Sequence, residues 1–112
     1  MNTIQTFDIG ELTNDMAGDP VEYLEFLKVP RLSCGLYSLA ASAIDTQLPH
    51  EEDEIYYVIA GSATFRTESG EEKISTGSVL YVAASAEHRF VDVKEDLSLL
   101  VFFAANQEAD RE

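Results

Sequence analysis

The sequence predicts an all-β fold, a sandwich or a barrel, and three observations indicate it. From Leu32 onward, short runs of β-branched, aromatic and aliphatic residues recur roughly every ten residues, with turn residues between them. No convincing helical periodicity separates these runs. The chain has 112 residues, which suffices for one hydrophobic core but not for two. We therefore expect a single domain with an N-terminal strand or arm in 1–30, a barrel in 31–105 and a frayed acidic tail in 106–112.

The expected strands follow one another with recognisable turns. Residues 68–71, Glu-Ser-Gly-Glu, are typical of a hairpin turn, because glycine tolerates the positive φ that such turns need. Thr76 and Gly77 form a second expected turn. The runs around these turns are the expected strands: Leu32–Ala41, Ile55–Ala60, Ala63–Arg66, Glu72–Ile74, Val79–Ala83, Glu87–Val91 and Leu97–Ala104.

Residues 20–28 allow two interpretations. Asp19 and Pro20 resemble a helix start, and apolar residues spaced three apart follow them. Alternatively, Tyr23–Val29 is an edge strand that ends before Pro30. We favour the strand.

Net charge is the unusual property of this chain. It has 21 acidic and 7 basic residues, a formal charge of −14 at pH 7. Nucleic acids and anionic membrane surfaces bind proteins through Lys and Arg. We therefore expect neither as a partner, and a polyanionic substrate would need a bound cation to offset the local field.

Cysteine content and apolar runs bear on the compartment. Cys34 is the only cysteine, so no intrachain disulfide is possible, and its apolar neighbours favour a packing role. The N-terminus has no cationic stretch followed by an apolar run. The longest apolar segment, Leu99–Ala105, is far too short to span a bilayer. We expect a cytoplasmic protein.

The two histidines carry the clearest chemical pattern. His50 opens the run His-Glu-Glu-Asp-Glu that ends at Glu54, and His88 belongs to a separate predicted strand. Because alternate residues of a strand share a face, His50, Glu52 and Glu54 would point the same way, toward His88. Two imidazoles and one or two carboxylates at one point describe a divalent transition-metal site. Taken singly, such a histidine is more often a hydrogen-bonded or surface residue, and such an acidic run a solvated turn.

The spacing of these residues resembles the two motifs of the cupin superfamily. The first motif reads Gly, five residues, His-x-His, three or four residues, Glu, six residues, Gly. His50, Glu54 and Gly61 match its second His, its Glu and its closing Gly. The second motif reads Gly, five residues, Pro-x-Gly, two residues, His, three residues, Asn. Gly77 and His88 match its opening Gly and its His.

Five motif positions carry other residues. Leu48 stands in place of the first His, and Ser42 in place of the leading Gly. Ala83, Ser85 and Asp92 replace the Pro, Gly and Asn of the second motif. The changes in turns should be tolerable, whereas the change at Leu48 removes one ligand from the usual set of three His and one Glu.

The resemblance covers residues 32–105 and implies a double-stranded β-helix, or jelly-roll, barrel. It also implies that His50, Glu54 and His88 are metal ligands, with Glu52 as a candidate fourth. Two histidines and one carboxylate leave open coordination positions, as in non-haem iron oxygenases, and manganese, nickel or zinc would also accept this set. The expected cofactor is one of these divalent ions.

A small apolar pocket is expected around the ligands. Tyr56 shares the strand parity of Glu54, and Phe90 shares that of His88, so these rings and Leu48 would line a pocket for a small aromatic or aliphatic molecule. Ordinary barrel packing explains Tyr56 at least equally well.

Three functions follow from these patterns. The first is a metal-dependent enzyme, dioxygenase-like or isomerase-like, that acts on a small organic molecule with Glu52 or a metal-bound hydroxide as catalytic base. The second is a non-catalytic module that holds a small ligand with no metal or a structural one. The third is an accessory role in which the acidic surface recognises a basic partner. The sequence does not decide among them.

A homodimer is the expected assembly. An edge strand at Tyr23–Val29 exposes unpaired backbone groups, which is a liability unless something covers them. Pairing with a second copy would satisfy them. The resemblance implies the same, because cupins are frequently dimeric through N-terminal strands.

Overall fold

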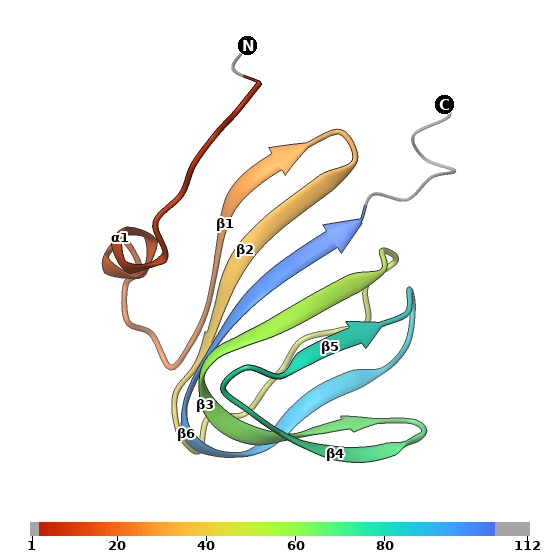
Figure 1. The fold of residues 1–112 in the computed structure, drawn as a ribbon. Helices are drawn as coiled ribbons and strands as arrows, with labels where there is room; N and C mark the ends of the chain where they lie inside the picture. Colours follow the sequence, from red (N-terminus) through yellow and green to blue (C-terminus); the bar gives the residue numbers. More distant parts are fainter. Residues whose placement is uncertain (1–2, 105–112) are drawn as a thin grey trace.

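The computed structural model describes residues 3–104, and antiparallel strands dominate them (Figure 1). Within these residues, one short helix, α1 (Ile9–Asn14), precedes six strands. The strands are β1 (Val21–Val29), β2 (Leu32–Leu39), β3 (Glu54–Thr67), β4 (Gly70–Ser75), β5 (Val79–Val82) and β6 (His88–Ala104). The acidic tail expected in 106–112 lies outside the described residues.

A single sheet contains all six strands, in the order β1-β2-β6-β3-β4, with β5 paired to the first part of β3. Every pairing is antiparallel. In the long β3–β6 ladder, Glu54 pairs with Phe103 at one end and Thr67 with His88 at the other. The sheet curls into a barrel-like shape (Figure 1), and this curl brings the two ends of the ladder together: the Glu54 and His88 side chains meet in the interior.

The bend of the long ladder is centred near Gly61. The register of β3 against β6 shifts three times between Val58 and Thr64, as bulges do in strongly bent strands. Gly61 has a φ of +99°, and a Cβ at this position would lie 2.3 Å from the Asp96 carbonyl oxygen. Only glycine accommodates both the backbone conformation and the close approach.

The core lies on the inner face of this sheet. Along β3, Glu54, Tyr56 and Val58 are buried while Ile55 and Tyr57 are about two-fifths exposed, as strand alternation predicts. Most of the buried apolar residues form one cluster, which Cys34 and Leu36 do not join: Tyr37, Leu39, Tyr56, Val58, Ala63, Phe65, Ile74, Val82, Phe90, Val93, Leu97, Leu99 and Val101.

The N-terminal region contains both a confirmed and a missed element. Residues 21–29 form strand β1 at the edge of the sheet, so the strand interpretation is confirmed and the helix alternative is wrong. Helix α1 was not predicted, because it buries no residue and therefore lacks an apolar stripe. The Asp8 side chain caps it, accepting a hydrogen bond of 3.0 Å from the Glu11 N–H. No helix within residues 3–104 is long and apolar enough to cross a membrane.

Two pairs of predicted strands are continuous in the structure. The runs 55–60 and 63–66 are both parts of β3, and the run 87–91, from its second residue on, and the run 97–104 are both parts of β6. Gly61 was expected to end a strand, but hydrogen bonding to the neighbouring strand resumes beyond it. A glycine bend inside a ladder looks the same in the sequence as a strand end.

Candidate metal centre

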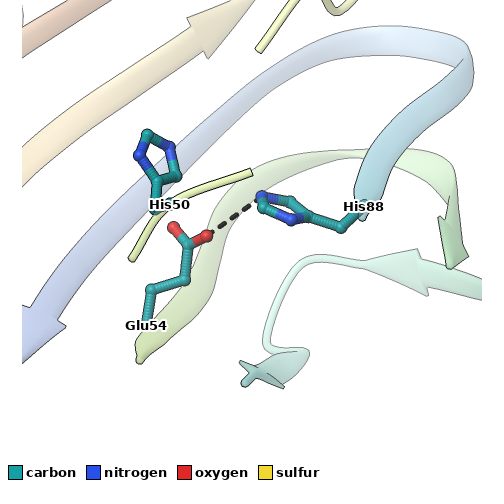
Figure 2. Close-up of side chains that lie close together, drawn as sticks. All are labelled: His50, Glu54 and His88. Atoms are coloured by element: carbon teal, nitrogen blue, oxygen red, sulfur yellow. Dashed lines mark ion pairs between the residues drawn. The ribbon is translucent and has the colours of Figure 1, made fainter. Parts of the chain in front are cut away.

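Three side chains from separate parts of the chain meet inside the barrel (Figure 2). Glu54 is the first residue of β3, His88 is the first residue of β6, and His50 comes from the irregular segment between β2 and β3. Each offers one ligand atom, and these atoms lie within 4.8 Å of one another. Glu54 and His88 are 2% and 6% exposed, and His50 is half-buried.

The Glu54 carboxylate has no ordinary partner in this position. Its Oε1 lies 3.0 Å from His88 Nε2, yet the pair does not have hydrogen-bond geometry. Neither carboxylate oxygen has a hydrogen-bond partner among residues 3–104, and both are buried. A buried carboxylate without donors is costly, and native structures avoid it unless an ion or another group compensates.

The orientation of His88 adds to this imbalance. Its Nδ1 lies 3.0 Å from the carbonyl oxygen of Ala86. A carbonyl only accepts, so Nδ1 carries the hydrogen, and Nε2 of the neutral ring presents its lone pair to Glu54. An Nδ1–H bonded to a backbone carbonyl is the usual support of a metal-ligating histidine. The three residues therefore fit a divalent transition metal.

The pKa of His88 responds to the same surroundings. Burial acts to lower this pKa, but the Glu54 carboxylate, the Ala86 carbonyl and the Asp45 carboxylate together outweigh it, and the pKa is raised above 6.5. The field at Nε2 therefore favours a positive charge there, whether a proton or a metal ion carries it.

Two further polar residues, Gln47 and Tyr56, reach the cluster. The Tyr56 hydroxyl donates to Gln47 Oε1 at 2.9 Å and lies 3.1 Å from His88 Nε2. Gln47 Oε1 is itself 3.3 Å from the same nitrogen. Several polar atoms thus converge on His88 Nε2.

Asp45 organises the segment that carries Gln47 and His50. Its carboxylate is 1% exposed and accepts from four donors: the Tyr37 hydroxyl at 2.7 Å, the Phe90 N–H at 2.9 Å, and the backbone and side-chain N–H groups of Gln47 at 3.1 and 2.7 Å. The Asp45 carboxylate thus ties the irregular segment to β2 and β6. Sequence reasoning missed Asp45 and Gln47, because neither occupies a motif position and the segment has no strand to supply a periodicity.

A cavity of about 220 Å³ opens beside the cluster. Tyr23 bounds it on the β1 side, and its ring lies over Gly35, where a Cβ would be 2.3 Å from the ring. Burial raises the pKa of Tyr23 to about 12 and also raises those of Tyr37 and Tyr56, so these hydroxyls stay protonated and do not act as bases near neutral pH. The lining residues are mostly aromatic: Tyr23, Tyr37, Gln47, His50, Tyr56, Val101 and Phe103.

Comparison with known proteins identifies the family. The model of the cupin domain matches residues 35–103, which is more than half of the chain. The chain belongs to the cupin family. An uncharacterized protein of Streptomyces coelicolor is 38% identical to it over 101 residues, which cover 90% of this chain and 96% of that relative.

Solved structures give the same fold. The protein TT1209 from Thermus thermophilus superposes on this cupin with a TM-score of 0.74 at 20% identity, over 90% of this chain and 97% of that one. The DMSP lyase DddQ from Ruegeria pomeroyi superposes with a TM-score of 0.73 at 18% identity, over 80% of this chain. This cupin spans only 49% of the lyase's length. At these identities the likeness concerns the fold, and the double-stranded β-helix expected from the sequence is confirmed.

Three of the five cupin motif positions that depart from the family pattern share a backbone feature. Ser42, Ser85 and Asp92, which replace the Gly, Gly and Asn of the motifs, have φ values of 67°, 66° and 49°. Within residues 3–104 they are the non-glycine residues with positive φ. At these positions this cupin has left-handed backbone with residues that adopt it less easily than glycine does.

The structure does not bring Glu52 into the ligand cluster. The group of converging ligand atoms found within residues 3–104 consists of His50, Glu54 and His88. The chain bends at Glu51 and Glu52 before β3 begins at Glu54, and Glu52 is half-buried between two exposed neighbours. Glu52 is also absent from the lining of the 220 Å³ cavity, although its charge reaches the Tyr23 hydroxyl that borders it, and its role as a base stays a prediction.

The three predicted pocket residues lie in different places. Tyr56 lines the 220 Å³ cavity, as expected. Leu48 is 75% exposed and lies instead at the rim of a separate cavity of about 370 Å³, which His88 also borders. Phe90 packs against Tyr56 and Phe65 in the core, with ring centroids 5.1 and 4.9 Å apart, and does not line the 220 Å³ cavity.

Proposed function

We propose that this cupin binds a divalent transition metal through His50, Glu54 and His88 and is a metal-dependent enzyme for a small, largely apolar organic molecule. The observation that carries the proposal is the buried Glu54 carboxylate, which lacks hydrogen-bond donors and faces the lone-pair nitrogen of His88 at 3.0 Å. Two acceptors in such contact repel unless a positive charge lies between them.

The donor set supports iron, manganese, nickel or zinc without selecting among them. When bound, such an ion supplies open coordination positions that polarise or activate a ligand placed there. The protein's own contribution is the cavity beside it. Its mostly aromatic walls suit a compact apolar molecule, and the Tyr56 hydroxyl oxygen can accept a hydrogen bond from that molecule while its own hydrogen goes to Gln47 Oε1.

The lining of the cavity favours a dioxygenase-like reaction over an isomerase-like one. Isomerisation by proton transfer needs a base of suitable pKa beside the substrate. Among the residues that line the 220 Å³ cavity there is no carboxylate, and its tyrosines have raised pKa values. His50 lies there as a ligand in this proposal. A metal-dependent oxidation would not need a base among the residues that line the cavity.

A second candidate function draws on the same absence of a base. A non-catalytic cupin would use the aromatic cavity to hold a small molecule, with the metal as an anchor or as a structural element. The two functions differ in turnover, because only the enzyme consumes dioxygen and changes its ligand.

Oxygen uptake by reconstituted protein tests the proposal. Metal-free protein is loaded anaerobically with Fe²⁺ and mixed with a panel of compact aromatic and aliphatic compounds in an oxygen electrode. We expect uptake that depends on one class of compound, is lost in His88→Ala and is unchanged in Glu51→Gln, an exposed neighbour of the ligands. The assay is repeated with manganese, nickel and zinc. Saturable binding of a compound without oxygen uptake, whichever of the four metals is loaded, would favour the non-catalytic function. Neither binding nor uptake would contradict both.

A further inference from the structure

We propose that Gln47 is a fourth ligand of the metal site, through its side-chain oxygen Oε1, and that it takes the place of the histidine that Leu48 replaces. The inference rests on the proposed metal site at His50, Glu54 and His88. It concerns a side chain whose carbonyl oxygen lies close to His88 Nε2 although no motif position marks it.

The hydrogen bonds of Asp45 fix the orientation of the Gln47 amide. Gln47 Nε2 lies 2.7 Å from Asp45 Oδ2, and the Gln47 backbone N–H donates to Asp45 Oδ1 at 3.1 Å. A buried carboxylate accepts and does not donate, so the NH₂ group of the amide must face Asp45. Oε1 therefore points the other way, toward the cluster.

Around Gln47 Oε1, hydrogen-bond acceptors outnumber the hydrogens available to them. Gln47 Oε1 is 3.3 Å from His88 Nε2, and both are acceptors because the ring hydrogen of His88 is used on the Ala86 carbonyl. The Tyr56 hydroxyl has a single hydrogen, which it gives to Gln47 Oε1 at 2.9 Å. Glu54 adds another acceptor 3.0 Å from the same nitrogen. A cation at the centre balances this surplus of lone pairs.

The distances are those of ligands that share an ion. Nitrogen and oxygen ligands stand roughly 2.0–2.2 Å from a divalent transition metal, so two neighbouring ligands are about 3.0–3.5 Å apart. The separation from His88 Nε2 is 3.0 Å for Glu54 Oε1 and 3.3 Å for Gln47 Oε1. Both values fall in that range.

The local path of the chain explains why Gln47 and not Leu48 reaches inward. Asp45 is buried and Gln47 half-buried, whereas Thr46 and Leu48 are exposed. Alternate residues of this extended segment thus face the interior, and the position of the missing histidine falls on the outward side. Gln47 also lines the 220 Å³ cavity together with His50, on the side where open coordination positions would meet a substrate.

Cobalt binding by the full chain tests the inference. Metal-free wild type, Gln47→Leu, Gln47→Glu and Leu48→Ala are titrated with Co²⁺, and affinity and the visible absorption of the bound ion are measured, since that absorption reports coordination number. We expect Gln47→Leu to bind Co²⁺ about 10–100-fold more weakly and with an altered spectrum. Gln47→Glu, which keeps an oxygen ligand, should retain the ion, and Leu48→Ala, the exposed neighbour, should match the wild type.

The outcomes separate this inference from the proposed metal site. If wild type binds Co²⁺, His88→Ala loses it and Gln47→Leu keeps both affinity and spectrum, Gln47 is not a ligand although the metal site stands. If wild type binds no metal, both fail. Should Gln47→Leu not fold, unmutated protein decides: the side-chain amide resonance of Gln47 must shift on titration with Zn²⁺, and an unmoved resonance at saturation would overturn the inference.

Discussion

Asp45 connects the stability of this cupin with its site. One buried carboxylate satisfies the Tyr37 hydroxyl, the Phe90 backbone and both N–H groups of Gln47, so it ties β2, β6 and the segment before His50 together. The positions of the site residues therefore depend on Asp45, which does not line the 220 Å³ cavity proposed for the substrate.

Replacement of Asp45 by alanine should be strongly destabilising. Asp45→Ala leaves buried donors without acceptors, and we expect a loss of about 3–5 kcal/mol in the free energy of unfolding. Urea denaturation measures it, with Glu51→Gln as an exposed acidic control that should change stability by about 0.5 kcal/mol or less. Equal stability of the two variants would show that the Asp45 network carries no net stabilisation.

His88 should titrate above its ordinary range in metal-free protein. The pKa of His88 is raised above 6.5, so its stabilising contribution is fully present below about pH 6.5 and is lost as pH rises through the folded-state pKa. NMR titration of chelator-treated protein should give that higher midpoint. Bound metal should abolish the titration, because the ion replaces the proton at Nε2. A midpoint at or below 6.5 without metal would contradict the assigned environment.

At the residue scale, the sequence could predict the candidate ligands that occupy motif positions, but not the site residues outside the motifs. His50, Glu54 and His88 were named from their spacing, and the structure brings them together. Gln47 and Asp45 lie in a segment without regular structure, where no periodicity states which side chains face inward. Their contacts depend on tertiary packing across β2, β3 and β6.

At the scale of elements, the alternation of residues between the two faces of a strand predicted which side chains of β3 are buried. It placed Tyr56 and Val58 on the buried face of β3 and Ile55 and Tyr57 on the other. Glu52, in the bend just before β3, is half-buried as alternation predicts, but it is not among the converging ligand atoms. The continuity of β3 through Gly61 could not be predicted either, since a glycine marks a bend and a strand end alike.

The turns with left-handed serines offer a stability test. Ser85 has a φ of 66° where the family pattern has glycine, and such a backbone costs a non-glycine residue roughly 1–2 kcal/mol. Glycine also loses more entropy on folding, so we expect Ser85→Gly to stabilise the protein by about 0.5–1 kcal/mol net. Thermal unfolding measures this. Ser69→Gly, in an exposed turn without positive φ, should instead destabilise slightly, and the reverse order would contradict the account.

For the whole molecule, the homodimer inferred from the sequence stays a prediction. β1 is an edge strand, paired with β2 on one side only among the described strands. Its free edge would be satisfied by a second copy. Light scattering at micromolar concentration should give twice the 12.4 kDa chain mass. A monomeric mass at that concentration would contradict the prediction, and β1 would then be an uncovered edge.

The curl of the whole sheet creates the proposed centre, since it brings together residues from opposite ends of the β3–β6 ladder. Elemental analysis of protein purified without tag or chelator, wild type beside His88→Ala, tests this claim most directly. We predict near-stoichiometric iron, manganese, nickel or zinc in the wild type and its loss in the variant, with the fold retained by circular dichroism. No metal in the wild type, and none taken up on reconstitution, would contradict the account.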